Sequence, residues 1–159
     1  MTDKTPFDIA KESAAGLARE NVALIECFFE ALGHDMETLR SLFTPDALYR
    51  DEPKKHAWDA IGPEGIAKKL GILAWVGVSG VRADVKTVVA QDHCVMTERD
   101  EEWRFETGEV GTIGITTVHK ITDGKISYWN DYYDIETARE FLPAAWLKEV
   151  DELLKQAEL

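Results

Sequence analysis

Hydrophobic residues in the first part of the chain recur at the spacing of an α-helix. Four of them lie three or four positions apart: Val22, Ile25, Phe29 and Leu32. They predict one face of a helix that stops near Gly33. Two further helices are predicted over residues 36–43 and 63–70. The start of the chain, through about Lys11, is polar, and we expect it to be loose.

The second half of the chain changes to the alternating pattern of β-strands. Strands are predicted over residues 83–91, 94–106, 110–121 and 125–134. Earlier, residues 46–52 predict one short strand, and the polar stretch 53–62 is interpreted as a loop. A closing helix is predicted over "IETAREF" and again, after a proline, in "AAWLKEVDELLKQ". Helices followed by an antiparallel meander predict an α+β fold, in which helices pack on one face of a curved sheet and leave a pocket between them.

Composition and charge narrow the possible classes. The length of 159 residues, 45% hydrophobic and 30% charged, is typical of one globular domain, and we interpret residues 1–159 as a single domain. A net charge of −12 argues against nucleic acid and anionic membrane as partners, because both require a basic surface. Without an export signal or an apolar run of about 20 residues, a cytoplasmic protein is expected.

Metal and cofactor signals are missing from the sequence. Cys27 and Cys94 lie far apart, with no histidine or aspartate at ligand spacing, and both are interpreted as buried small side chains. No glycine-rich phosphate loop precedes a helix, and no Ser-His-Asp or Cys-His set is visible. The sequence therefore predicts no metal and no cofactor.

The stretch "TERDEEWRF" (97–105) places two charged residues on a hydrophobic face. Counting by twos, one side carries Glu98 and Asp100 and faces water, whereas the other carries Trp103 and must face the core. Arg99 and Glu101 share the side of Trp103, so they are predicted to point inward.

The same count on other strands adds Asp131, flanked by two aromatic residues of its own face, and Tyr49 with Asp51. Buried charges persist when they are paired, and an arginine can bridge two carboxylates, here Glu101 and Asp131. A plain ion pair at a sheet edge is the alternative, because a slip of one residue exchanges the two faces. The remaining polar candidates are predicted to be solvent-exposed: His119, Lys120, Lys68 and Lys69.

Three segments together resemble the limonene-1,2-epoxide hydrolase family: "TERDEEWRF", "TDGKISYWNDYYDIET" and "LFTPDALYRDEP". This family belongs to the wider NTF2-like and SnoaL-like group of cystatin-like α+β proteins, with ketosteroid isomerase, scytalone dehydratase and the polyketide cyclases. The likeness covers about residues 18 to 140. It implies an NTF2-like cone, in which a strongly curved mixed or antiparallel sheet wraps around N-terminal helices and encloses a pocket. It also implies hydrolysis without a cofactor, a small apolar organic substrate and a homodimer.

The resemblance also implies roles for individual residues. The family has an arginine and an aspartate two residues apart, a later aspartate, and a tyrosine and an asparagine two residues apart. Carried over, Arg99 links the acid Glu101 to the base Asp131, while Tyr49 and Asp51 hold the water. Glu101 stands where the family has the aspartate, and Asp51 where it has the asparagine. If Asp51 and Asp131 approach one water, repulsion should keep one of them protonated.

Three hypotheses follow. The first is a cofactor-independent hydrolase that adds water to a small apolar epoxide in one step. The second is another enzyme of this fold, namely an isomerase, dehydratase or polyketide cyclase that uses Asp131 or Asp51 as a base beside a carbonyl. The third is a non-catalytic protein that binds a small ligand, in which Arg99 holds a carboxylate or a structural ion pair.

Overall fold

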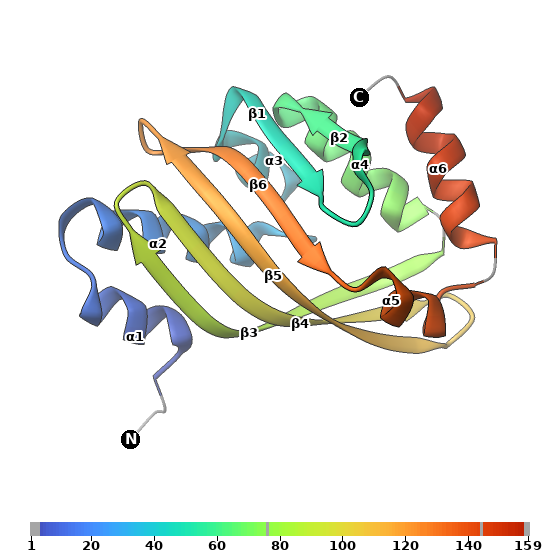
Figure 1. Cartoon of the computed structure of the whole chain (residues 1–159), viewed down its shortest axis with the longest axis horizontal. Helices are drawn as coiled ribbons and strands as arrows, with labels where there is room; N and C mark the ends of the chain where they lie inside the picture. Colours follow the sequence, from blue (N-terminus) through green and yellow to red (C-terminus); the bar gives the residue numbers. More distant parts are fainter. Residues whose placement is uncertain (1–3, 76, 144, 158–159) are drawn as a thin grey trace.

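The computed structural model describes residues 4–75, 77–143 and 145–157, which form one mixed six-stranded sheet and six helices (Figure 1). The strands are β1 (Phe43–Asp51), β2 (Lys55–Ile61), β3 (Val78–Gln91), β4 (Cys94–Phe105), β5 (Val110–Thr122) and β6 (Lys125–Tyr133). The helices are α1 (Pro6–Ser13), α2 (Gly16–Ala31), α3 (Met36–Ser41), α4 (Gly62–Trp75), α5 (Ile135–Phe141) and α6 (Trp146–Gln156). The α+β prediction is confirmed.

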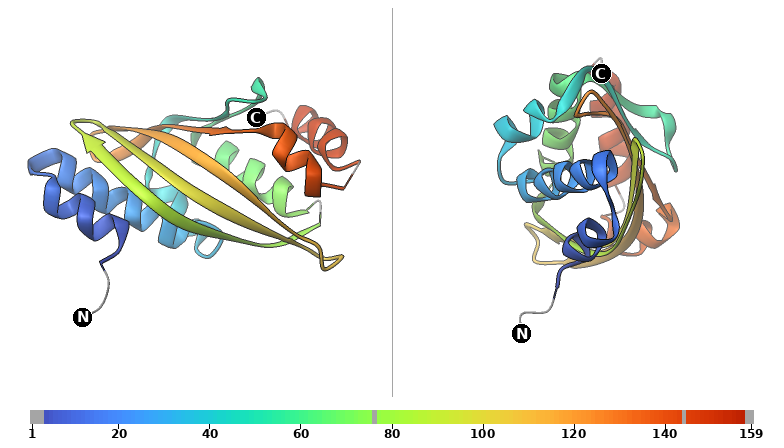
Figure 2. Two further views of the ribbon diagram at one scale, coloured as in Figure 1. Left: turned by 60° about the horizontal axis from the view of Figure 1, so that its bottom comes forward. Right: turned by 90° about the vertical axis from the view of Figure 1, so that its left-hand side faces the viewer.

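The strand order is β2-β1-β6-β5-β4-β3, in which β1 and β6 run parallel and the other neighbours antiparallel. The long strands β3, β4 and β5 curve around α1, α2 and α4, which lie on the concave face (Figure 2). Helices α5 and α6 lie at the opposite end of the molecule from α1 (Figure 1). None of the helices in the described ranges combines the length and hydrophobicity needed to cross a membrane.

Two hydrophobic clusters fill the concave side. The first core joins α1, α2 and α3 to the sheet and includes Phe28 and Trp129, whose rings meet edge to face with centroids 4.8 Å apart. The second core joins α5 and α6 to the other end of the strands and includes Ile113 and Trp146. Along β4, β5 and β6 alike, buried polar residues separate the two cores. This polar band is where the predicted site residues lie.

The start of the chain differs from the prediction of a loose segment. Residues Pro6–Ser13 form α1, whose first turn carries a capping box between Thr5 and Asp8. Phe7 is buried, with its ring centroid 5.9 Å from that of Phe29. The expected loose segment covers residues 1–11, of which 1–3 lie outside the described residues. The helix at Pro6–Ser13 forms because the polar average conceals one hydrophobic face and a capped helix start.

The polar stretch 53–62, interpreted as a loop, contains the edge strand β2. This strand pairs antiparallel with β1 and buries alternate residues, Trp58 and Ala60, while its ends are exposed. An edge strand shows its polar side to water, so its average composition resembles that of a loop.

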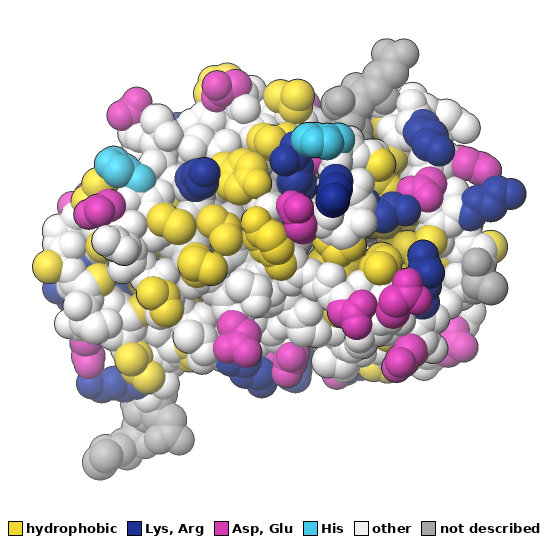
Figure 3. Space-filling model, viewed as in Figure 1, with side chains coloured by type: hydrophobic (Ala, Val, Ile, Leu, Met, Phe, Trp, Pro, Cys, Tyr) yellow, Lys and Arg dark blue, Asp and Glu magenta, His cyan; other side chains and the backbone are white. Residues whose placement is uncertain are grey.

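The outer face of the sheet carries hydrophobic side chains near its middle (Figure 3). Large exposed hydrophobic residues on its strands include Val89, Met96 and Tyr132. The homodimer implied by the sequence resemblance stays a prediction.

Candidate active site

The two faces of β4 lie as the alternating pattern predicts. Glu98 and Asp100 are exposed on the outer face, whereas Arg99 and Glu101 are buried on the inner face at 1% and 6% exposure. Strand β4 is paired along its length with β3 on one side and β5 on the other, which holds this register. Arg99 and Glu101 therefore point into the polar band between the two cores.

Arg99 bridges the two predicted carboxylates. Its Nε donates a hydrogen bond to Glu101 Oε1 at 2.8 Å, and its Nη2 donates to Asp131 Oδ2 at 3.2 Å. Its Nη1 donates to the hydroxyl of Thr117, which in turn donates to Asp131 Oδ1. Burial lowers the pKa of Arg99, but the nearby Asp131 and Glu101 outweigh it and raise the pKa above its ordinary value. The guanidinium thus stays charged between its two acids.

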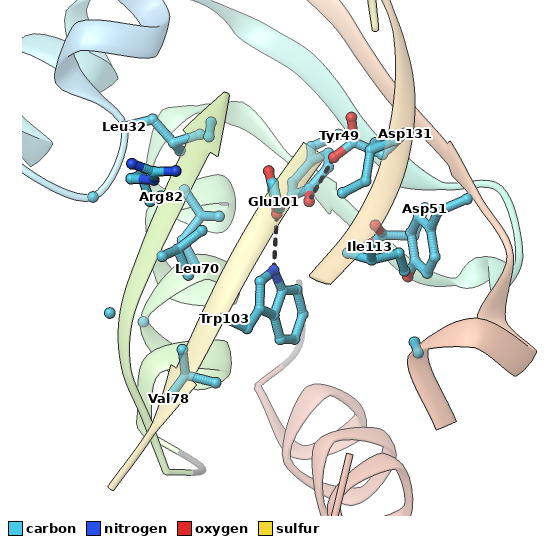
Figure 4. Close-up of a pocket in the computed structure, with 18 of the residues that line it drawn as sticks. Leu32, Tyr49, Asp51, Leu70, Val78, Arg82, Glu101, Trp103, Ile113 and Asp131 are labelled. Atoms are coloured by element: carbon cyan, nitrogen blue, oxygen red, sulfur yellow. Dashed lines mark hydrogen bonds between the residues drawn. The ribbon is translucent and has the colours of Figure 1, made fainter. Parts of the chain in front are cut away.

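Tyr49 and Trp129 complete the surroundings of Asp131. The indole Nε1 of Trp129 donates to Asp131 Oδ1 at 2.8 Å, and the Tyr49 hydroxyl donates to Oδ2 at 3.4 Å (Figure 4). The two aromatic rings stack with centroids 3.7 Å apart. Burial, followed by the charges of Asp51 and Asp131, raises the pKa of Tyr49 well above its ordinary value, so the phenol remains a hydrogen-bond donor.

Asp51 has a cationic partner that the sequence interpretation missed. Lys69 on α4 is fully buried, and its Nζ lies 2.5 Å from Asp51 Oδ2 and 3.5 Å from the centroid of the Tyr49 ring. The prediction that Lys69 faces solvent was wrong. The available signal was its helical spacing, three residues after the buried Ile66. The sequence predicts one buried cation in the site, Arg99, whereas the structure contains two, Arg99 and Lys69.

Burial is the largest cause of a raised pKa at Asp51. The Lys69 ammonium opposes this effect, while the charges of Asp131 and Glu101 add to it. Asp51 and Asp131 are partners in the parallel register of β1 and β6, so their side chains leave the same face of the sheet next to each other.

A cavity of about 960 Å³ opens beside the polar band. Tyr49, Asp51, Glu101 and Asp131 reach its wall, which is otherwise mainly hydrophobic (Figure 4). Trp103 lies on the same wall, and its Nε1 donates to Glu101 Oε2 at 3.0 Å. The volume lies near the upper end of the roughly 300–1,000 Å³ of sites for drug-sized ligands. Carboxyl groups inside such a cavity can exchange protons with a bound molecule away from bulk water.

His119 was predicted to be exposed, and this was also wrong. It lies fully buried on β5, with its ring 5.0 Å from that of Phe28. Burial is the main cause that lowers the pKa of His119 to about 3, so the imidazole is neutral. The alternation of Ile113, Ile115 and Thr117 before it places it on the inner face. Lys120 and Lys68 are exposed, as predicted.

Replacing His119 by leucine should weaken the fall of the free energy of unfolding with decreasing pH. The folded protein keeps His119 neutral down to about pH 3, whereas the unfolded chain binds a proton below the ordinary pKa of about 6.5. Between these values the unfolded state holds more protons, so the free energy of unfolding should fall with decreasing pH by up to about 1.4 kcal/mol per unit. Urea denaturation above and below pH 6.5 measures this slope. Equal slopes in the wild type and His119→Leu would contradict the prediction.

In the part of the chain that the structure describes, no group of three or more His, Cys, Asp or Glu residues is arranged to hold a metal ion. The buried carboxylates face cations of the protein itself, Arg99 and Lys69. The arrangement is suited to proton transfer by carboxyl groups.

Several solved structures share this fold at low sequence identity. An M. tuberculosis LEH-like epoxide hydrolase has a TM-score of 0.67 and 21% identity over 87% of this chain and 98% of that chain. A putative SnoaL-like polyketide cyclase from Jannaschia sp. CCS1 has a TM-score of 0.73 and 13% identity over 83% and 97%. TerC, crystallised with polyporic acid, has a TM-score of 0.69 and 20% identity over 77% and 97%. At these identities the likeness shows the fold alone.

A family model supplies the assignment that the structures leave open. The SnoaL-like domain matches residues 25–129, a stretch that includes Tyr49, Asp51, Arg99 and Glu101 and stops just before Asp131. This stretch is more than half of the 159 residues. The chain belongs to the SnoaL-like domain family.

Proposed function

We propose that the protein is a cofactor-independent epoxide hydrolase that adds water to an apolar organic epoxide in one step. The observation that carries the proposal is the buried Arg99, which binds Glu101 and Asp131 at the same time. Both of these acids reach the wall of a mainly hydrophobic cavity. The sequence resemblance to limonene-1,2-epoxide hydrolases involves these residues. The similar fold of an LEH-like epoxide hydrolase supports the proposal.

The arrangement supplies both halves of an acid–base reaction. Glu101 reaches the cavity and is held by Arg99 and Trp103, which suits it to protonate the epoxide oxygen as the ring opens. A second carboxylate must take the proton of the attacking water, and the resemblance assigns this role to Asp131. Tyr49 remains protonated and donates to Asp131, and its hydroxyl oxygen can accept a hydrogen bond from that water. The hydrophobic wall binds the hydrocarbon part of the substrate and limits entry of other water.

A second candidate is an isomerase, dehydratase or polyketide cyclase. The observation in its favour is Asp51, a carboxylate on the cavity wall with a raised pKa, which is the property of a base that removes a proton next to a carbonyl. A protein of this class, a putative polyketide cyclase, shares the fold. Incorporation of deuterium from solvent at a C–H position of a carbonyl compound, without net hydration, would favour this candidate.

Incubation with a panel of epoxides in ¹⁸O-labelled water tests the first proposal. We expect a diol that carries one labelled oxygen, formed in single-turnover experiments as well, because attack by water leaves no unlabelled oxygen from a protein carboxylate in the product. A mixture without protein is the control for background hydrolysis. If no epoxide of the panel gives a diol above the rate without protein, the hydrolase proposal fails.

A further inference from the structure

The acceptor positions of Asp131 are already filled. A carboxylate offers about four lone-pair positions, two on each oxygen. Oδ1 accepts from Thr117 and Trp129, and Oδ2 accepts from Arg99 and Tyr49. A general base needs a free lone pair that points at the proton it removes. Asp131 could accept from water only by giving up one of these donors.

Asp51 has open capacity on the same cavity wall. Its Oδ2 faces the Lys69 ammonium, and Tyr133 lies beside the carboxyl group. Burial, the largest cause, and the neighbouring Asp51 raise the pKa of Tyr133 well above its ordinary value, so this phenol also stays protonated. Two partners leave acceptor positions of Asp51 available to a bound water.

The charges of the cluster also call for an acid and a base. Three carboxyl groups, from Asp51, Glu101 and Asp131, meet two buried cations, Arg99 and Lys69. An uncompensated buried charge is costly, so the cluster favours binding one proton. One carboxyl group can then donate a proton while another accepts one.

We infer that Asp51, held in place by Lys69, accepts the proton of the attacking water, and that Asp131 organises the site without accepting it. The inference rests on the proposed hydrolase function of the same cavity. In the reaction the water oxygen bonds to one epoxide carbon, and the C–O bond at that carbon breaks. The proton of the water moves to Asp51, and the epoxide oxygen takes a proton from Glu101. Return of the proton from Asp51 to Glu101 restores the starting state.

The surroundings of Asp51 tune it for this role. Its pKa is raised by burial, which makes the carboxylate a better proton acceptor, and the Lys69 ammonium opposes this rise. The other charged or titratable groups near it are Asp131 and Tyr133 on β6, Glu101 on β4 and Tyr49 on β1. Lys69 is buried behind Asp51 and acts as a positioning residue.

Asp51→Asn separates the two assignments, because the resemblance places an asparagine at this position. If Asp51 is the acceptor, kcat should fall by about 10²- to 10⁴-fold. Retention or gain of activity would overturn the inference and leave the hydrolase proposal intact. Failure of the hydrolase proposal would give a different result, because the wild type itself would then be inactive on all epoxides.

Two further variants distinguish the loss of a proton acceptor from a failure to fold. Asp51→Asn combined with Lys69→Met replaces both partners by neutral side chains, so no lone charge stays buried, and it should be folded and equally inactive. Asp100→Asn, on the exposed face of β4, is the matched control and should keep wild-type activity. A folded double variant with wild-type kcat would also overturn the inference.

Lys69→Met alone gives a readout that a purely structural role would not change. Asp51 must be ionised to accept a proton, so activity should rise with pH through its apparent pKa. Without the cation that lowers this pKa, the acid limb of the kcat/KM profile should move to higher pH. An acid limb at the same pH in Lys69→Met and wild type would contradict the assignment.

Discussion

Arg99→Met is expected to lower the free energy of unfolding by about 3–5 kcal/mol, because it leaves carboxylates buried without their cation. Arg99 is 1% exposed and binds Glu101, Thr117 and Asp131, so no water can replace its donors without opening the polar band. Urea denaturation at neutral pH measures the loss. Activity should also disappear, because the acid would lose its orientation.

Arg104→Met is the matched control for this change. Arg104 lies on the same strand and pairs with Glu102, but its side chain is 64% exposed. Exposed pairs contribute little, so its replacement should change the free energy of unfolding by no more than about 0.5 kcal/mol. Similar losses in the two variants would show that the buried bridge has no special part in the fold.

Glu101→Gln should reduce kcat by about 10²- to 10⁴-fold on any epoxide that the wild type hydrolyses, because an amide cannot transfer a proton to the opening ring. The side chains have nearly the same shape, and the single amide oxygen can keep one of the two hydrogen bonds, from Arg99 or from Trp103, that Glu101 accepts. The free energy of unfolding should therefore change less than in Arg99→Met. Steady-state kinetics with a substrate from the labelled-water experiment measures the effect.

Glu98→Gln, on the exposed face of the same strand, is the control for Glu101→Gln. It removes an equal charge outside the cavity and should leave kcat unchanged. A folded Glu101→Gln protein with the activity of the wild type would assign proton donation to another group.

Much of the site could be predicted because strands have a period of two. On β4 a single count assigns Arg99 and Glu101 to the buried side, and on β6 it assigns Asp131 to the side of Trp129. The pairing then follows from energetics, since a buried arginine requires carboxylates. That both acids lie within hydrogen-bond distance of Arg99 agrees with this expectation.

The predictions that differ from the structure share a physical cause, because local composition does not determine which residues pack together over long distances in the chain. The polar start of the chain forms α1 because Phe7 packs into the first core. The polar stretch after β1 forms β2 because Trp58 packs into the second core. His119 is buried because Phe28 and Phe29 of α2 pack against its ring on the inner face of β5.

The sequence by itself determined the α+β class, the inward faces of the strands and the bridging role of Arg99, because these depend on periodicity and on the cost of a lone buried charge. Only the tertiary structure decided that Lys69 reaches Asp51. The angle at which α4 packs over β1 and β2 depends on contacts far apart in the chain, and a lysine on a helix carries no local sign of the carboxylate it will meet. Because of this contact, we propose Asp51 as the base, although the resemblance places an asparagine at its position.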